Sequence, residues 1–261
     1  MAARRGCSRG GQRHGRLPGG HGQAGHIYGQ NGPYLRSHTG YKNLNLRYLS
    51  ASLALSFEDA VARLHAGKGL VYPTETFFGL GCKATDHEAV ALIAQCKTRP
   101  VYKPVPVIAG SVEQLALLTP GFQERPQENA FEAIAAAFWP GPVAVLLPAR
   151  QELPRPLHGA TGHVAARICG HPLARRLCLE AGEPLTATSA NQSGEPPAAR
   201  LDELDPELVR AVGGYIAAEP QPAGGRPSTI VSIEPDGSLR VVREGIVPTL
   251  VLEQAGFCIV S

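Results

Sequence analysis

Residues 164–188 read VAARICGHPLARRLCLEAGEPLTAT and contain one complete strand–helix–strand unit. The apolar run 164–168 predicts a central strand, and residues 185–188 predict a second one. Residues 172–181, which lie between them, predict a helix. Arg167 places a charge near the end of the first apolar run. This order of elements is typical of α/β proteins.

The same alternation continues on both sides of this unit. Further strands are predicted at 70–72, 105–109, 143–147, 229–233 and 239–242, and further helices at 56–66, 86–96, 111–118, 128–138 and 201–212. Ser56 and Asp86 stand where they can cap their helices. Pro235-Asp236-Gly237 separates the last two strands and predicts a hairpin. We therefore expect an α/β fold with an open, twisted, mixed sheet flanked by helices.

Composition limits the class of protein. The chain has 261 residues, of which 43% are hydrophobic, and this is enough for a sizeable core. No apolar run is long enough to cross a bilayer, so we expect no contact with a membrane. The six cysteines form no CxxC pair and no zinc-type spacing with histidine. They predict buried thiols in a reducing compartment, the cytoplasm, and no metal site.

Residues 1–50 differ from the rest of the chain. They contain eight arginine or lysine residues and no carboxylate, and they are rich in glycine. Because they show neither a helical nor a strand period, we expect a disordered extension or a start codon assigned too far upstream. A basic tail that touches RNA is the alternative. The folded domain is then residues 51–261, in which carboxylates outnumber basic residues.

The chain lacks two familiar nucleotide-binding signatures. It has no GxxxxGK[ST] loop, and Gly79-Leu80-Gly81 lacks the third glycine of a dinucleotide fingerprint. If the chain binds ATP, other residues must bind it. Four polar segments punctuated by glycine or proline remain as candidates. Taken singly, each also fits an ordinary turn, a hairpin end or a helix end.

The first two candidate segments are YPTETFFGLG at 72–81 and KTRPVYKP at 97–104. The first places threonine hydroxyls beside a strand end, where α/β sheets hold ligands. The second places Lys97, Arg99 and Lys103 on a loop stiffened by prolines. Three cations so close together suit a polyphosphate, although the dipole at a helix end also explains Lys97 alone.

The other two candidate segments follow later strands. TSANQSG at 188–194 presents Ser189 and Asn191 directly after a predicted strand. PSTIV at 227–231 presents Ser228, and Arg243 stands across the predicted hairpin from it. Arg167 belongs with these residues because a charge at the end of an apolar strand needs an anionic partner. That partner is either a ligand or a structural carboxylate.

Taken together, these segments resemble the YrdC/TsaC family of threonylcarbamoyl-AMP synthases. The motifs occur in family order over about residues 53–246: YPTET and GLG, KxRP, an arginine-bearing strand followed by HP, TSAN-x-SG, PSTIV, and a final Arg-x-Gly. The resemblance implies a YrdC-like domain with a large concave, positively lined cavity. It implies a nucleotidyltransferase that makes threonylcarbamoyl-AMP and pyrophosphate from L-threonine, bicarbonate or CO2, and ATP. The product serves threonylcarbamoyladenosine modification of tRNA, so tRNA is an indirect partner.

The resemblance also implies residue roles. L-Threonine would contact Thr76, Arg167 and Ser228. ATP would be bound by Lys97, Arg99, Lys103, Ser189, Asn191 and Arg243, with Mg2+ held by the phosphates and water. The chain departs from the family pattern at Cys169, where many members have proline, and at Ala187, which replaces a hydroxyl residue.

Two other functions remain open at this point. An RNA-binding or ribosome-maturation factor of the same fold would explain the basic residues 1–50, but no motif of stacking aromatic residues occurs. A carbamoyl-transfer accessory domain, as in hydrogenase maturation, would carry zinc-type cysteine motifs, and this chain has none.

Overall fold

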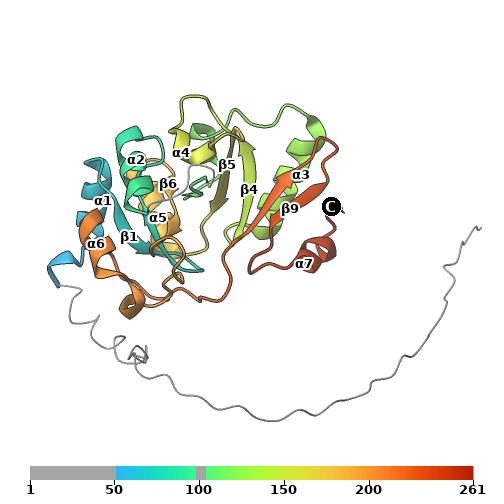
Figure 1. Cartoon of the computed structure of the whole chain (residues 1–261). Coiled ribbons are helices and arrows are strands. Elements are labelled where there is room, and N and C mark those ends of the chain that lie inside the picture. The colour runs from blue at the N-terminus through green and yellow to red at the C-terminus, as the bar shows by residue number, and fades with distance from the viewer. Residues whose placement is uncertain (1–50, 98–103, 261) are drawn as a thin grey trace, which may run out of the picture. The chain divides into compact units, whose positions relative to one another are not determined.

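The computed structural model describes residues 51–97 and 104–260, and helices and strands alternate through this part of the chain (Figure 1). The helices are η2 (Ala51–Leu53), α1 (Phe57–His65), α2 (His87–Cys96), η3 (Glu113–Leu117), α3 (Arg125–Phe138), α4 (Arg155–His158), α5 (Pro172–Ala181), η4 (Leu201–Glu203), α6 (Pro206–Val212) and α7 (Thr249–Gln254). The strands are β1 (Leu70–Pro73), β2 (Phe78–Gly81), β3 (Val107–Ala109), β4 (Val143–Pro148), β5 (His163–Ile168), β6 (Leu185–Thr186), β7 (Thr188–Ser189), β8 (Thr229–Ile233), β9 (Leu239–Arg243) and β10 (Ile259–Val260).

The strands form two open sheets in the described residues. The seven-stranded sheet has the order β10-β9-β8-β4-β5-β3-β6 and combines parallel pairs, such as β3 with β5, with antiparallel pairs, such as β4 with β5. The three-stranded sheet, β1-β2-β7, is antiparallel. The predicted fold class, an α/β fold with an open mixed sheet flanked by helices, is confirmed, although the strands form two sheets and not one.

Helices α1, α2, α5 and α6 lie toward one end of this arrangement and α3 and α7 toward the other, with α4 between them (Figure 1). Helices α1, α5 and α6 pack against β1, and α2 packs against β2. At the other end, α3 packs against β8, and α7 packs against β10. In the described part of the chain, no helix combines the length and the apolar character needed to cross a bilayer.

Local capping signals are confirmed where the sequence predicts them. The Ser56 hydroxyl accepts a hydrogen bond from the Asp59 N–H at 3.0 Å, and the Asp86 carboxylate accepts one from the Ala89 N–H at 2.9 Å. These side chains satisfy N–H groups that have no partner within the helix, and each cap typically stabilises its helix by about 1 kcal/mol.

Several predicted elements differ from the structure. Phe78–Gly81, whose glycines favour a turn, is the buried strand β2. The predicted helix 201–212 divides into η4 and α6, because Leu204 and Asp205 have extended backbone and Asp205 caps the second helix. The predicted helix 111–118 is the shorter 3-10 helix η3. Short elements that no pattern announced, α4, α7 and β10, are present as well.

The predicted strand 185–188 is two strands in different sheets. β6 pairs with β3 in the larger sheet, with Leu185 opposite Ile108. β7 pairs with β2 in the smaller sheet, with Ser189 opposite Gly79. Between them, the Ala187 N–H donates to the Pro106 carbonyl at 2.8 Å. A single residue therefore connects the two sheets.

Glycine at position 81 allows β2 to lie close to β6. A Cβ atom on Gly81 would collide with the Thr186 carbonyl oxygen, which also accepts a hydrogen bond from the buried Tyr72 hydroxyl at 2.5 Å. The Thr186 hydroxyl accepts from the Cys82 N–H at 3.0 Å. This glycine is needed for a close approach of two backbones.

Candidate functional site

A cavity of about 110 Å³ is lined by residues of both sheets. Its walls come from the β1–β2 turn, from β5, from the passage between β6 and β7, and from the residues around the β8–β9 hairpin: Thr74, Thr76, Phe77, Phe78, Gly79, Arg167, Ala187, Thr188, Ser189, Pro227, Ser228 and Arg243. The structure thus brings together five residues that the sequence marks as candidates: Thr76, Arg167, Ser189, Ser228 and Arg243.

The β1–β2 turn is held by the hydroxyl of Thr74. This oxygen accepts hydrogen bonds from the N–H groups of Thr76 and Phe77, each at 3.3 Å, and donates to the Phe77 carbonyl at 2.7 Å. Such side-chain contacts replace backbone hydrogen bonds that a tight turn cannot make. The turn therefore fixes the buried Thr76 side chain at the cavity wall.

A segment after α6 secures the same turn from outside. The Gly224 N–H donates to the Thr76 carbonyl at 2.8 Å, and the Ala223 N–H donates to the Glu75 carbonyl at 3.2 Å. The buried His171 side chain holds this segment, since its Nε2–H donates to the Pro220 carbonyl at 2.8 Å. His171 Nδ1 accepts from the Leu173 N–H at 3.2 Å and caps α5, so the ring carries its proton on Nε2.

Arg167 is almost fully buried at the end of β5 and forms an ion pair with Glu75. Its Nε donates to Glu75 Oε1 at 2.9 Å. The second oxygen, Glu75 Oε2, accepts from the Cys169 thiol at 2.9 Å and from the Gly170 N–H at 3.2 Å. Arg167 therefore has a structural carboxylate partner, which is one of the two possibilities left open by the sequence, and it also lines the cavity.

The electrostatics of this pair follow from burial and from charge. Burial raises the pKa of the Glu75 carboxyl, but the Arg167 charge and the hydrogen bonds from Arg167 and Cys169 outweigh it, so the pKa of Glu75 is lowered. Burial lowers the pKa of Arg167, but the Glu75 carboxylate outweighs this effect. The pKa of Arg167 is therefore raised, and the guanidinium stays charged. Burial also raises the pKa of the Cys169 thiol well above its ordinary value. Cys169 is therefore a neutral donor.

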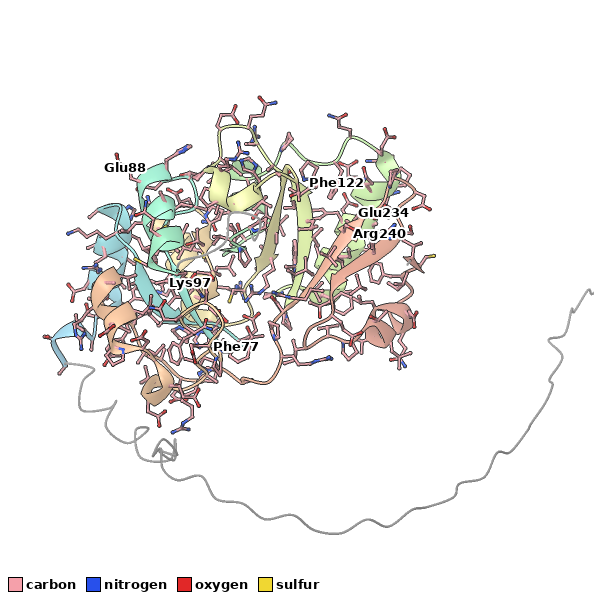
Figure 2. All side chains as sticks on the ribbon, in the orientation of Figure 1. Phe77, Glu88, Lys97, Phe122, Glu234 and Arg240 are labelled. Carbon is pink, nitrogen blue, oxygen red and sulfur yellow. The ribbon has the colours of Figure 1, made fainter. Side chains whose placement is uncertain are left out.

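Lys97 follows α2 as its C-cap residue and reaches the Ser189–Asn191 element. Its Nζ donates to the Ser189 carbonyl, to Ser189 Oγ at 3.3 Å and to Asn191 Oδ1 at 3.2 Å. Ser189 Oγ donates in turn to Asn191 Oδ1 at 2.5 Å. Lys97 and Phe77, both labelled in Figure 2, lie in the half of the domain that contains α2, β1 and β2. Three predicted ATP-binding residues are thus assembled in one cluster.

Ser228 and Arg243 face each other across the β8–β9 hairpin. The Arg243 guanidinium donates to the Ser228 carbonyl from Nε at 3.2 Å and from Nη2 at 2.7 Å, and Nη2 lies 3.4 Å from Ser228 Oγ. Two hydrogen bonds that converge on one carbonyl oxygen orient the guanidinium plane. Arg99 and Lys103, by contrast, lie outside the described residues. Their contact with ATP stays a prediction, and so does the large positively lined cavity.

Comparison with known proteins places the chain in a family. The family model of the Sua5, YciO and YrdC proteins, which carries the description "Telomere recombination", matches residues 62–245.

The chain belongs to the Sua5/YciO/YrdC family.

Individual members of the Sua5/YciO/YrdC family are similar over most of the domain. The threonylcarbamoyl-AMP synthase of Stenotrophomonas maltophilia (strain K279a) is 39% identical over 165 residues, which cover 63% of this chain and 87% of that protein. The crystal structure of P. abyssi Sua5 complexed with L-threonine is 28% identical, with a TM-score of 0.68, and the match covers 78% of this chain and 58% of that longer one. The crystal structure of E. coli YciO is 25% identical, with a TM-score of 0.60, and the match covers 73% and 89%.

The sequence pattern missed residues that complete the site of this Sua5/YciO/YrdC domain. Thr74, which shapes the turn, was noted only as a hydroxyl, and Glu75 was not singled out at all. The signal for Glu75 was its place between two threonines at a strand end. Its partner, however, is 92 positions away, and only the sheet topology brings the two together. Cys169 was noted as a departure from the family, and its thiol bonds the same carboxylate.

Proposed function

We propose that this chain catalyses the synthesis of threonylcarbamoyl-AMP from L-threonine, bicarbonate or CO2, and ATP, with release of pyrophosphate. The proposal is supported by the relatives named above and by the P. abyssi Sua5 structure with L-threonine. The observation that carries it is the cavity itself, in which a buried guanidinium stands among hydroxyl groups. The reaction class is nucleotidyl transfer, because the adenylyl group of ATP moves to a carboxylate.

The cavity suits L-threonine in size and in polarity. At about 110 Å³ it is far smaller than the roughly 300–1,000 Å³ of pockets that hold drug-sized ligands. The terminal nitrogens of Arg167 are shaped to hold a carboxylate by two parallel bonds. The hydroxyls of Thr76 and Ser228 line the same cavity and are suited to pair with the threonine hydroxyl and amine. We therefore propose that these three residues bind threonine.

ATP is proposed to bind beside this cavity, along the cationic elements. Ser189 and Arg243 line the cavity. Lys97 and Asn191 both form hydrogen bonds with the Ser189 hydroxyl. Arg99 and Lys103 follow Lys97 directly in the sequence. In the described residues, no group of histidine, cysteine and carboxylate side chains is placed to hold a metal ion. We propose that Mg2+ enters with ATP as part of the substrate, coordinated by phosphate oxygens and water.

The proposed reaction has two steps. The threonine amine adds to CO2 and loses a proton, which forms an N-carboxylate. An oxygen of that carboxylate attacks the α-phosphorus of ATP, and the bond to the pyrophosphate oxygen breaks. The residues of this chain act by holding the carboxylate of threonine and by neutralising phosphate charge, and both effects lower the barrier without covalent chemistry by the protein. The mixed anhydride then passes its threonylcarbamoyl group, through partner enzymes in the cytoplasm, to adenosine in tRNA.

One assay tests this function directly. Pyrophosphate release from ATP should require both L-threonine and bicarbonate, and mass spectrometry should detect threonylcarbamoyl-AMP. Serine lacks one methyl group, whose burial is worth roughly 1 kcal/mol, so threonine should be favoured about fivefold. The 2-aminobutyrate analogue should react less well still, because the hydroxyl partners are left unpaired. Salt-dependent RNA binding without pyrophosphate release would support the RNA-binding alternative instead.

A further inference from the structure

The Glu75 carboxylate is surrounded by donors from one short stretch of chain. Arg167 Nε, the Cys169 thiol and the Gly170 N–H all donate to it, at 2.9, 2.9 and 3.2 Å. All three donors come from the end of β5 and the residues directly after it. Glu75 itself lies on the turn that carries Thr76, and the Gly224 segment holds that turn. Its position is therefore fixed from two sides.

These contacts decide which part of the Arg167 guanidinium is available to a ligand. The donors of the guanidinium lie in one plane and form a rigid fork. Nε is bonded to Glu75, and within the described residues the structure gives the two terminal nitrogens, Nη1 and Nη2, no hydrogen-bond partner. Arg167 lines the cavity, and the described lining does not include Glu75. Glu75 thus contacts the guanidinium at Nε and does not belong to the described lining of the cavity.

We propose that Glu75 is a positioning residue, which fixes the Arg167 guanidinium so that its two terminal nitrogens face the cavity as a carboxylate-binding fork. The proposal deepens the proposed function and rests on it for the identity of the ligand, the carboxylate of L-threonine. Glu75 acts through Arg167 and makes no contact with substrate of its own.

The charge of the pair explains why a carboxylate is needed in this position. Arg167 is only 3% exposed, and an isolated charge at that depth is strongly unfavourable. Glu75 balances it, so the fork is formed before any substrate arrives. Because the pair is neutral as a whole, recognition of the substrate carboxylate depends on the alignment of two N–H groups more than on attraction by a bare charge.

The hydrogen bonds from Cys169 and Gly170 keep the Glu75 carboxylate in one orientation. They occupy Oε2, and this leaves Oε1 for Arg167 Nε. An amide in place of the carboxylate has one accepting oxygen and a donating nitrogen, so it cannot accept from donors on both sides. Glu75→Gln should therefore release either Arg167 or the Cys169 and Gly170 donors.

The experiment compares Michaelis constants for L-threonine and for ATP in the pyrophosphate assay. Glu75→Gln should raise the threonine constant by roughly tenfold to a hundredfold, the usual effect of losing a charged hydrogen bond, and should change the ATP constant by less than about twofold. Cys169→Ala should raise the threonine constant by a few fold, and Cys169→Ser, which keeps a donor, should stay close to the wild type. Glu183→Gln is the matched control, because it removes a similarly half-buried ion pair, with Lys83, outside the cavity lining.

A second readout does not depend on activity. The Arg167 Nε–H should give a slowly exchanging signal in ¹⁵N NMR spectra, assigned by its loss in Arg167→Lys, and Glu75→Gln should abolish that slow exchange. An ordered Nε–H and an unchanged Michaelis constant for threonine in Glu75→Gln would overturn the positioning role. A lower Michaelis constant for threonine would overturn it too, because Glu75 would then only reduce the attraction between Arg167 and the substrate carboxylate. If the wild type makes no threonylcarbamoyl-AMP, the proposed function fails, while the NMR comparison still tests the link between Glu75 and Arg167.

Discussion

Arg167 and Lys97 are two buried cations of the same site, each 3% exposed, and the protein holds them in different ways. Arg167 is paired with a carboxylate, Glu75. The described acceptors of Lys97 are neutral: the Ser189 carbonyl, the Ser189 hydroxyl and the Asn191 amide oxygen. The first arrangement sets the orientation of a fork whose charge is already balanced. The second couples a lysine to the element that we propose binds ATP. The two cations should therefore respond differently to mutation.

The largest expected effect is on folding. Arg167→Met removes one partner of a buried ion pair and leaves the Glu75 carboxylate without its counter-charge, so the free energy of unfolding should fall by about 3–5 kcal/mol. Urea unfolding measures the loss. In the double variant Glu75→Gln/Arg167→Met much of it should return, and equal losses in the single and double variants would contradict a coupled pair.

The next effect separates the two halves of the site. Lys97→Met should raise the Michaelis constant for ATP by an amount equivalent to about 1.5–3 kcal/mol and leave that for threonine nearly unchanged. Arg167→Lys should do the reverse, because lysine keeps the charge but loses the fork. Both constants come from the same pyrophosphate assay. If either variant shifts the constant of the other substrate, the assignment of these cations to separate substrates is wrong.

A smaller effect concerns pH. Since the pKa of Glu75 is lowered in the folded protein, its ion pair contributes stability that is present above the unfolded pKa of about 4.3 and is lost as the pH falls through the folded value. Wild type and Glu75→Gln should therefore converge in stability between about pH 5 and the acid limit of folding. Urea midpoints at several pH values measure this. A difference that stays constant with pH would show that Glu75 is not the titrating group.

The smallest expected effect is that of removing residues 1–50. Because this segment shows no period that could pack, a chain that begins at Ala51 should keep the same cooperative melting transition and the same pyrophosphate release. Thermal unfolding of both chains tests this, with RNA affinity as a second measurement. Loss of the transition would show that the segment belongs to the folded domain.

The sequence predicts well those features of secondary structure that depend only on residues close together in the chain. The Ser56 and Asp86 caps and the helix at 172–181 follow from local rules, and the structure confirms them. β2 was missed because glycine is a turn signal, whereas Gly81 is needed for the close approach of the Thr186 carbonyl. That neighbour is distant in sequence, so no local pattern reveals it.

For the site, the motifs indicate segments that the structure brings together, but they do not indicate the partners of their side chains. Thr76, Arg167, Ser189, Ser228 and Arg243 do line one cavity, as their common family origin suggested. Glu75 lies on the turn between β1 and β2 of the smaller sheet, and Arg167 lies on β5 of the larger sheet. Their ion pair therefore depends on how the two sheets are placed. A single sequence contains no direct record of such a pairing, and for that reason the carboxylate behind the arginine was overlooked.

The passage of the chain from one sheet to the other at Ala187 also sets a length. Ile108 of β3 is paired with Arg167 on one side and with Leu185 on the other, and four residues further along the chain stands Ser189. Successive Cα atoms are 3.8 Å apart, so the four steps from Leu185 to Ser189 have an upper limit of length. The arginine that we propose holds the amino acid and the serine that we propose meets the nucleotide are thus connected through two paired strands and a short path of limited length. An amino acid with one extra backbone carbon between carboxylate and amine should place its N-carboxylate differently relative to the α-phosphorus of ATP, and it should therefore react less well than L-threonine.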